Sequence, residues 1–149
     1  MSNLGVFSHR YSSMSDLSRE INDATIIIKK AHYNLAGKKD ISPSQLAESR
    51  QYLIDVFINL MKNIQPEIHD FDSEIKKPIQ LPISFIDHVK NSNKSEMTYF
   101  IDDLKKIINH LEKDQNLSLQ DLKILDKMCS IMDEETSASF RKFWRKRSI

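Results

Sequence analysis

Apolar side chains recur every three or four residues in four separate segments of the chain, and α-helices are the elements that place such a series on one face. The four apolar stripes cover residues 17–35, 46–64, 97–111 and 122–143. A shorter stretch, from Ile83 to about Lys90, has the same spacing. The chain is therefore expected to form four long amphipathic helices and one short one.

Local signals mark where several of these helices begin. Ser42-Pro43-Ser44-Gln45 combines a hydroxyl at the N-cap, proline at the first helical position and glutamine at the third. Ser118 and Asp121 form a second capping box, without the proline and with aspartate as a weaker substitute at the third helical position. The first helix is expected to begin near Ser13 or Ser15, where a hydroxyl can accept from free backbone N–H groups. The caps therefore support the same helices as the apolar stripes do.

Composition agrees with a helical fold. The chain of 149 residues has two glycines, Gly5 and Gly37, whereas tight turns and phosphate-binding loops need residues without Cβ. This scarcity disfavours β-barrel, Rossmann and P-loop folds. Apolar residues make up 40% of the sequence, which is enough for one packed core in a chain of this length. We therefore predict an all-α, single-domain helical bundle of four long helices plus one short helix.

Two segments lack the helical period. Residues 1–13 are polar with scattered aromatic side chains and are expected to form a flexible N-terminal arm, so that the bundle domain covers residues 14–149. Residues 66–82 hold three prolines and are expected to form a connector that is long for a compact bundle. The last helix is expected to finish in a basic C-terminal end.

Charge and cysteine content indicate a cytoplasmic protein. The formal net charge is +1, so no overall field attracts nucleic acid or anionic lipid. The chain has no run of 18 apolar residues to span a membrane, and its first 18 residues have no apolar stretch typical of a secretory signal. Cys129 is the single cysteine, so no intrachain disulfide can form, which fits a reducing compartment.

The spacing of titratable residues indicates no catalytic or metal centre. None of the five histidines forms an HxxxH or HExxH pair, so a helical zinc site lacks its ligand spacing. Residues 70–74 resemble the first half of a calcium loop, but Ile75 and Leu81 occupy the positions where an EF-hand needs glycine and glutamate. Cys129 lies within the last apolar stripe and is interpreted as a small hydrophobe. We therefore expect no enzyme activity, no metal and no cofactor.

One short segment concentrates positive charge near the C-terminus. The candidate polyanion-binding or partner-binding residues there are Arg141, Lys142, Phe143, Trp144, Arg145, Lys146 and Arg147. Five cations flank two aromatic rings, a composition suited to phosphate contact with base stacking or to an anionic membrane surface. Cations in a last helical turn also complement the helix dipole, and the two rings can close the end of a bundle. Both interpretations stay open at this point.

The lack of catalytic spacing favours a non-enzymatic interaction protein, such as an adaptor, a regulator, a small effector or an accessory subunit. Such a protein would act through contacts with a protein partner, and formation of a homo-oligomer is compatible with its helices. The alternative hypothesis is a nucleic-acid-binding accessory protein that uses residues 141–147. A partner that survives nuclease treatment would favour the first hypothesis, and co-purified nucleic acid would favour the second.

Overall fold

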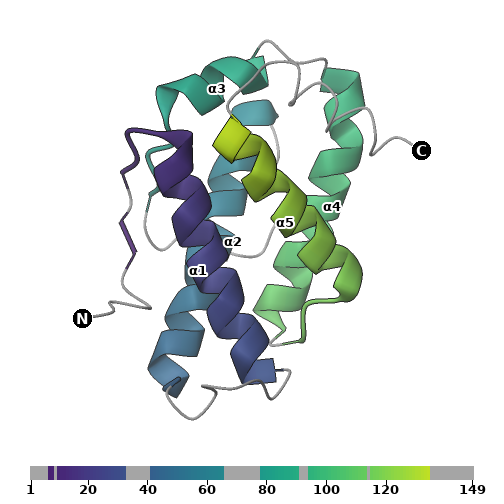
Figure 1. Cartoon of the computed structure of the whole chain (residues 1–149). Helices are drawn as coiled ribbons and strands as arrows, with labels where there is room; N and C mark the ends of the chain where they lie inside the picture. The colour runs from purple at the N-terminus through teal and green to yellow at the C-terminus, as the bar shows by residue number, and fades with distance from the viewer. Residues whose placement is uncertain are drawn as a thin grey trace.

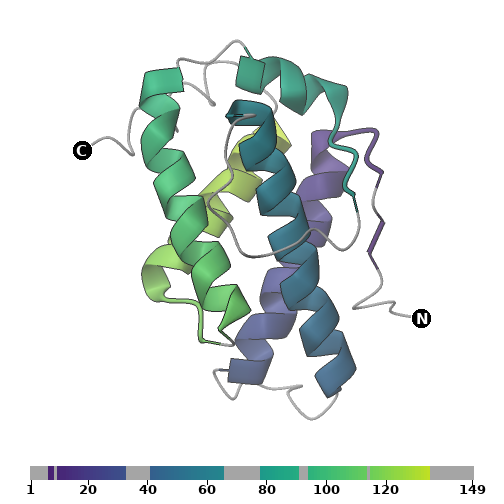
Figure 2. The ribbon, with the colours of Figure 1, turned by 180° about the vertical axis from the view of Figure 1, so that it is seen from behind.

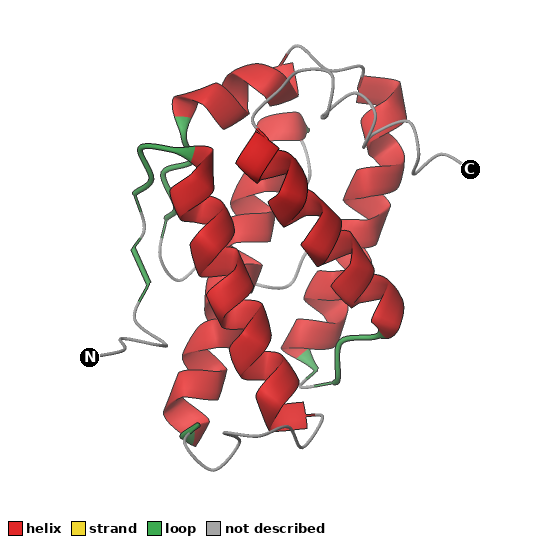
Figure 3. Cartoon of the chain, in the orientation of Figure 1, coloured by secondary structure: helices red, strands yellow, loops and turns green. Residues whose placement is uncertain are grey.

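The computed structural model describes residues 7–8, 10–32, 41–65, 78–90, 94–113 and 115–134. These residues form helices α1 (Met14–His32), α2 (Pro43–Ile64), α3 (Ile83–Lys90), α4 (Lys94–Glu112) and α5 (Leu119–Glu134), drawn in Figure 1. Figure 3 shows helices and loops in the described part of the chain and no strand, and the single β-type contact there is an isolated bridge between Arg10 and Gln80. The predicted all-α bundle of four long helices and one short helix is confirmed.

The four long helices form a closed ring of neighbours. α1 packs on α2, α2 on α4, α4 on α5 and α5 back on α1. Seen from behind, α2 lies between α4 and α1, whereas α5 crosses the opposite side of the molecule (Figures 1 and 2). The short helix α3 lies across one end of the bundle and contacts α2, and its Phe85 side chain belongs to the buried core. This arrangement leaves the outer faces of α1 and α5 side by side.

Helix α2 is more deeply buried than a single apolar stripe implies. The predicted stripe members Leu53, Phe57 and Met61 are fully buried, as expected. Tyr52 and Ile54 are buried as well, although they lie outside that stripe. The reason is that α2 packs against α1, α4 and α3, and that Phe7 and Tyr11 of the N-terminal segment contact Tyr52. α2 therefore has a longer run of consecutive buried residues, 52–58, than one apolar stripe would give.

Two of the predicted caps are complete capping boxes. Ser42 Oγ accepts a hydrogen bond from the Gln45 backbone N–H at 3.1 Å, and the Ser42 N–H donates to Gln45 Oε1 at 3.0 Å. At the start of α5, Ser118 Oγ accepts from the Asp121 N–H at 3.0 Å, and the Ser118 N–H donates to Asp121 Oδ2 at 3.0 Å. Aspartate therefore serves in the second box where glutamate or glutamine is usual. Ser13 caps α1 in a simpler way, by accepting from the Asp16 N–H at 3.2 Å.

Within the segment predicted to be an N-terminal arm, residues 7, 8 and 10–13 are described, and several of them contact the bundle. The Phe7 ring stacks on the Tyr52 ring with centroids 4.2 Å apart. The Tyr11 side chain is buried, and its hydroxyl lies 2.6 Å from both the Tyr52 hydroxyl and the Ser8 carbonyl oxygen. Tyr11 donates to that carbonyl, which leaves Tyr52 to donate its proton to the Tyr11 oxygen. Phe7 and Tyr11 thus pack against α2 although the sequence around them has no helical period.

The last five residues of the predicted connector also belong to the packed structure. Ile79 and Leu81 are buried, and the Gln80 carbonyl accepts from the Tyr11 backbone N–H at 3.2 Å. The alternation of apolar and polar residues from 79 to 81 is typical of an extended segment with one buried face. The rest of the connector, residues 66–77, lies outside the described part of the chain.

Candidate binding groove between helices α1 and α5

Helices α1 and α5 run in opposite directions and are joined near one end. Ser18 Oγ donates a hydrogen bond to the Cys129 carbonyl oxygen at 3.1 Å. The Cys129 thiol lies 3.6 Å from the Ser18 carbonyl oxygen and donates to it. Ser18 lies early in α1 and Cys129 lies late in α5, so this reciprocal contact holds the two helices together at that end. Away from it, the helices diverge toward the first turn of α5 (Figure 1).

The start of α5 contacts α4, whereas its later part contacts α1. Asp121 Oδ2, besides accepting from the Ser118 N–H, lies 2.6 Å from His110 Nδ1 near the end of α4. The Asp121 side chain is almost fully buried. α5 therefore begins on α4 and finishes on α1, and this diagonal course separates its first turns from α1.

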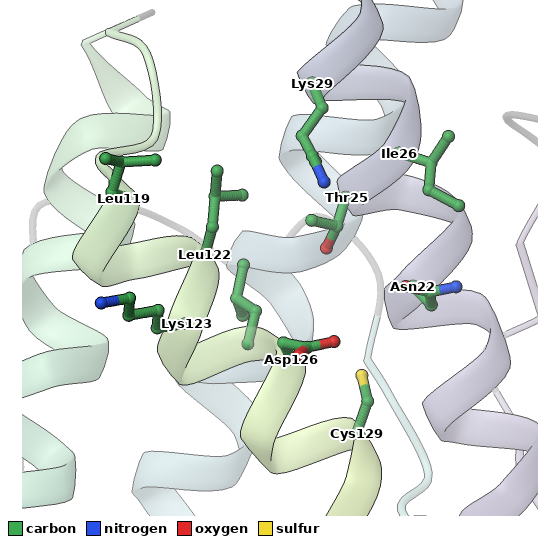
Figure 4. Close-up of a pocket in the computed structure, with 10 residues that line it drawn as sticks. Asn22, Thr25, Ile26, Lys29, Leu119, Leu122, Lys123, Asp126 and Cys129 are labelled. Atoms are coloured by element: carbon green, nitrogen blue, oxygen red, sulfur yellow. The ribbon is translucent and has the colours of Figure 1, made fainter.

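An open groove of about 390 Å³ occupies the space between the diverging helices. Figure 4 shows the side chains along it, which come from α1 on one side and α5 on the other. The lining residues are Asn22, Thr25, Ile26, Lys29, Leu119, Leu122, Lys123, Leu125, Asp126 and Cys129. This volume falls within the range of roughly 300–1,000 Å³ that is usual for ligand sites in proteins.

The surface of the groove is largely apolar. Leu125 is fully buried at its base, and Leu122 and Ile26 are half-buried. Thr25 is also buried, but its hydroxyl donates to the Ile21 carbonyl oxygen within α1 at 2.8 Å and so needs no outside partner. An apolar lining without unsatisfied hydroxyl groups suits contact with another apolar surface.

Leu119 gives the groove an exposed apolar edge. Its side chain is 74% exposed in the first turn of α5, and Leu119 and Ile83 are the two large apolar residues that are exposed in the described part of the chain. Burying a leucine side chain is worth about 1.5–3 kcal/mol. A partner that covers Leu119 would therefore gain that burial energy.

Charged side chains lie around this apolar lining. Lys29 of α1 lies at the wide end, opposite Leu119, and its ammonium group points toward the groove (Figure 4). Lys123 lies on the outer edge of α5. Asp126 lies nearer the narrow end, and its carboxylate points toward Asn22 of α1. Of these charged groups, the Lys29 ammonium and the Asp126 carboxylate face the groove, whereas the Lys123 ammonium points away from α1 (Figure 4).

Cys129 lines the narrow end, but its thiol is not activated. Burial is the main cause that raises the pKa of the Cys129 thiol to about 11, against a smaller lowering by the hydrogen bond to Ser18. The thiol is therefore protonated near neutral pH, whereas the thiolate is the reactive nucleophile. This supports the interpretation of Cys129 as a packing residue, because its side chain packs against the main core and joins α5 to α1.

The basic segment that the sequence offered as a site, from Arg141 through Lys142, Phe143, Trp144, Arg145 and Lys146 to Arg147, lies outside the described residues. The groove itself was missed. The sequence did indicate an apolar surface outside the core: Ile26, Ile27 and Ile28 are consecutive, and three consecutive residues of a helix cannot all face one core. Leu119, next to the cap of the last helix, was a second apolar residue outside the core face. Within the described part of the chain, no group of three or more His, Cys, Asp or Glu side chains could hold a metal ion.

Comparison of the chain with protein-family models, with curated proteins and with solved structures gives no match. None of the helices in the described residues combines the length and the apolar character that crossing a membrane requires.

Proposed function

We propose that this chain is a non-enzymatic helical interaction protein, acting as an adaptor, a regulator, a small effector or an accessory subunit, and that it binds a protein partner in the α1–α5 groove. The observation that carries this proposal is the exposed Leu119 beside an open groove with an apolar base. Isolated exposed leucines are common on protein surfaces, but apolar surface that continues into a groove is typical of interaction sites.

The shape of the groove supports a helical segment as the bound element. Two helices that diverge leave an elongated channel, and an amphipathic helix can lay its apolar face into such a channel through side chains at i, i+3 or i+4, and i+7. Leu119 and Leu122 lie three residues apart on α5, so they present a matching apolar row along one wall. This apolar row supports the proposal that α5 supplies one wall of a helix-binding site.

Site-specific photo-crosslinking in the native cell tests this proposal. A photoreactive amino acid replaces Asn22, which is exposed and lines the groove, or Asn63 in the last turn of α2, which is an exposed helical asparagine outside it. We expect a protein adduct from position 22, absent from position 63, resistant to nuclease and lost when Leu119→Asp is added. Equal adducts from both positions, or an adduct that persists with Leu119→Asp, would contradict binding at the groove.

A second candidate function rests on the composition of residues 141–147, in which five cations flank two aromatic rings. This composition supports a nucleic-acid-binding accessory protein, or contact with an anionic surface, through phosphate neutralisation and base stacking. The nuclease step of the same experiment separates the two candidates. Loss of the recovered partners after nuclease, with no adduct from position 22, would favour the nucleic-acid function.

A further inference from the structure

We infer that a second copy of this chain occupies the α1–α5 groove, in a two-fold symmetric contact in which Lys29 of each copy faces Asp126 of the other. This inference rests on the proposed function and names the protein partner. Two copies related by a two-fold axis use the same surface on both sides, so that surface has to be complementary to itself. The groove face combines apolar side chains with one inward-facing charge of each sign, which meets that condition.

The two charges that face the groove are of opposite sign and lie on opposite walls. The Lys29 ammonium extends from α1 at the wide end, and the Asp126 carboxylate extends from α5 nearer the narrow end (Figure 4). Neither group forms an ion pair with another residue of the described ranges, so both can pair with an outside group. A two-fold axis that lies in the contact and crosses the line between them exchanges their positions. Each lysine then faces the aspartate of the other copy.

Other occupants complement these charges less well. A purely apolar segment would leave both charges at the edge of a buried contact, which costs desolvation without compensation. A segment with charges of one sign would attract one of the two groups and repel the other. A second copy supplies one group of each sign, and the Lys123 ammonium, which points away from α1, stays in solvent. The net charge of +1 adds little repulsion between two copies.

The exposed edge of α5 supplies the apolar part of this contact. Leu119 and Leu122 lie three residues apart on one side of α5 and form an apolar row. In the symmetric pair, the row of each copy covers the apolar lining of the other, where Ile26 is half-buried and Leu125 forms the base. The largely exposed Leu119 of both copies is thereby removed from water, which favours association.

Analytical ultracentrifugation of the purified full chain tests this inference. We expect a concentration-dependent equilibrium between monomer and dimer, which Leu119→Asp abolishes. Lys29→Glu and Asp126→Lys each replace an attraction with a repulsion at two symmetric positions, so each should weaken the dimer by about tenfold. The matched controls are Lys62→Glu and Asp102→Lys, which make the same charge changes at exposed positions outside the groove and should leave the dimer unchanged.

An equimolar mixture of Lys29→Glu and Asp126→Lys makes the test specific for the symmetric contact. The first variant has two acidic groups at the groove and the second has two basic groups, so a mixed dimer regains an attraction at both positions. We expect the mixture to dimerise as tightly as the unaltered chain does. A contact within one chain cannot produce this recovery, because each chain of the mixture has like charges only. The double variant Lys29→Glu/Asp126→Lys should also dimerise normally, and far-UV circular dichroism of each variant checks that its helices are intact.

The outcomes separate this inference from the proposed function. A mixture that associates as weakly as its components, or a dimer that persists with Leu119→Asp, would overturn the symmetric contact at the groove. A chain that stays monomeric at millimolar concentration, while the photo-crosslink from position 22 contains a different protein, would overturn the second copy and leave the proposed function standing. A monomeric chain without any adduct from position 22 would overturn both.

Discussion

Arg50 joins α2 to the end of α4, and replacing it should strongly destabilise the bundle. Its side chain is 4% exposed in the first half of α2. Nη1 donates to the Leu111 carbonyl oxygen and Nη2 donates to the Gln115 carbonyl oxygen, each at 3.1 Å. Leu111 lies in the last turn of α4, where carbonyl groups have no partner within the helix. The guanidinium therefore provides the cap that the end of α4 needs, and its positive charge complements the helix dipole there.

The magnitude follows from these two hydrogen bonds. A hydrogen bond from a charged group contributes about 1.5–3 kcal/mol, and a buried carbonyl that loses its donor carries a desolvation cost. Water can reach the exposed Gln115 after truncation, which offsets part of the loss on that side. Arg50→Ala should thus lower the free energy of unfolding by about 3–5 kcal/mol, which includes the lost packing of the arginine stem. A typical domain has about 5–15 kcal/mol in total, so this loss is large.

Urea denaturation followed by far-UV circular dichroism measures the effect. With a denaturant slope of about 2 kcal/mol/M, Arg50→Ala should lower the urea midpoint by about 1.5–2.5 M. The midpoint of Arg50→Lys should lie between those of the unaltered chain and Arg50→Ala, because lysine keeps the charge but lacks the two donor nitrogens of the guanidinium. The matched control is Arg19→Ala. The Arg19 side chain is 70% exposed and pairs with Asp16 at 2.8 Å, so its loss should cost less than about 1 kcal/mol. Equal shifts for the two alanine variants would refute the assigned role of Arg50.

Three further predictions address the cap, the thiol and the basic segment. Ser42→Ala removes the acceptor of the Gln45 N–H and should lower the free energy of unfolding by about 0.5–2 kcal/mol; an unchanged urea midpoint would contradict this cap. Burial raises the pKa of Cys129 from 9.0 to about 11. At pH 8, a thiol reagent should therefore label the native chain about a hundredfold more slowly than the unfolded chain, and the native rate should rise with pH until about 11. Rapid labelling of the native chain at pH 8 would refute this. Replacing the five cations of residues 141–147 with glutamine should flatten the salt dependence of polyanion binding and leave the fold intact. Trp144→Ala should weaken binding to single-stranded nucleic acid by about 1–3 kcal/mol. If the unaltered chain does not bind DNA, RNA or anionic vesicles at low salt, that site is refuted.

The elements that sequence reasoning recovered are those that depend on neighbours in the chain. The capping box at Ser42 and the one at Ser118 each join residues three positions apart, so the sequence displays both partners together. The apolar stripe of α1 is equally local, and its members Leu17, Ile21 and Ile28 are buried as the period predicts. Element type and start were predictable for this reason.

The features that sequence reasoning missed join residues far apart in the chain. Arg50 lies 61 residues from its acceptor Leu111, and nothing in its own neighbourhood indicates that an arginine is buried there. Phe7 and Tyr52 stack although their segments are separated by a whole helix. The groove depends on the angle between α1 and α5, which is a property of packing and has no local sequence signature.

The contacts at the two ends of α5 explain why a groove exists at all. At its start, the Asp121 carboxylate accepts from the Ser118 N–H and binds His110, which fixes the first turn to α4. Near its end, the exchange of hydrogen bonds between Ser18 and Cys129 fixes the helix to α1. A helix held by α4 at one end and by α1 at the other must cross the surface diagonally, so its first turns cannot close against α1. The opening beside Leu119 is therefore built into the fold by two distant anchors, and a bound helix could fill it without separating α5 from either neighbour.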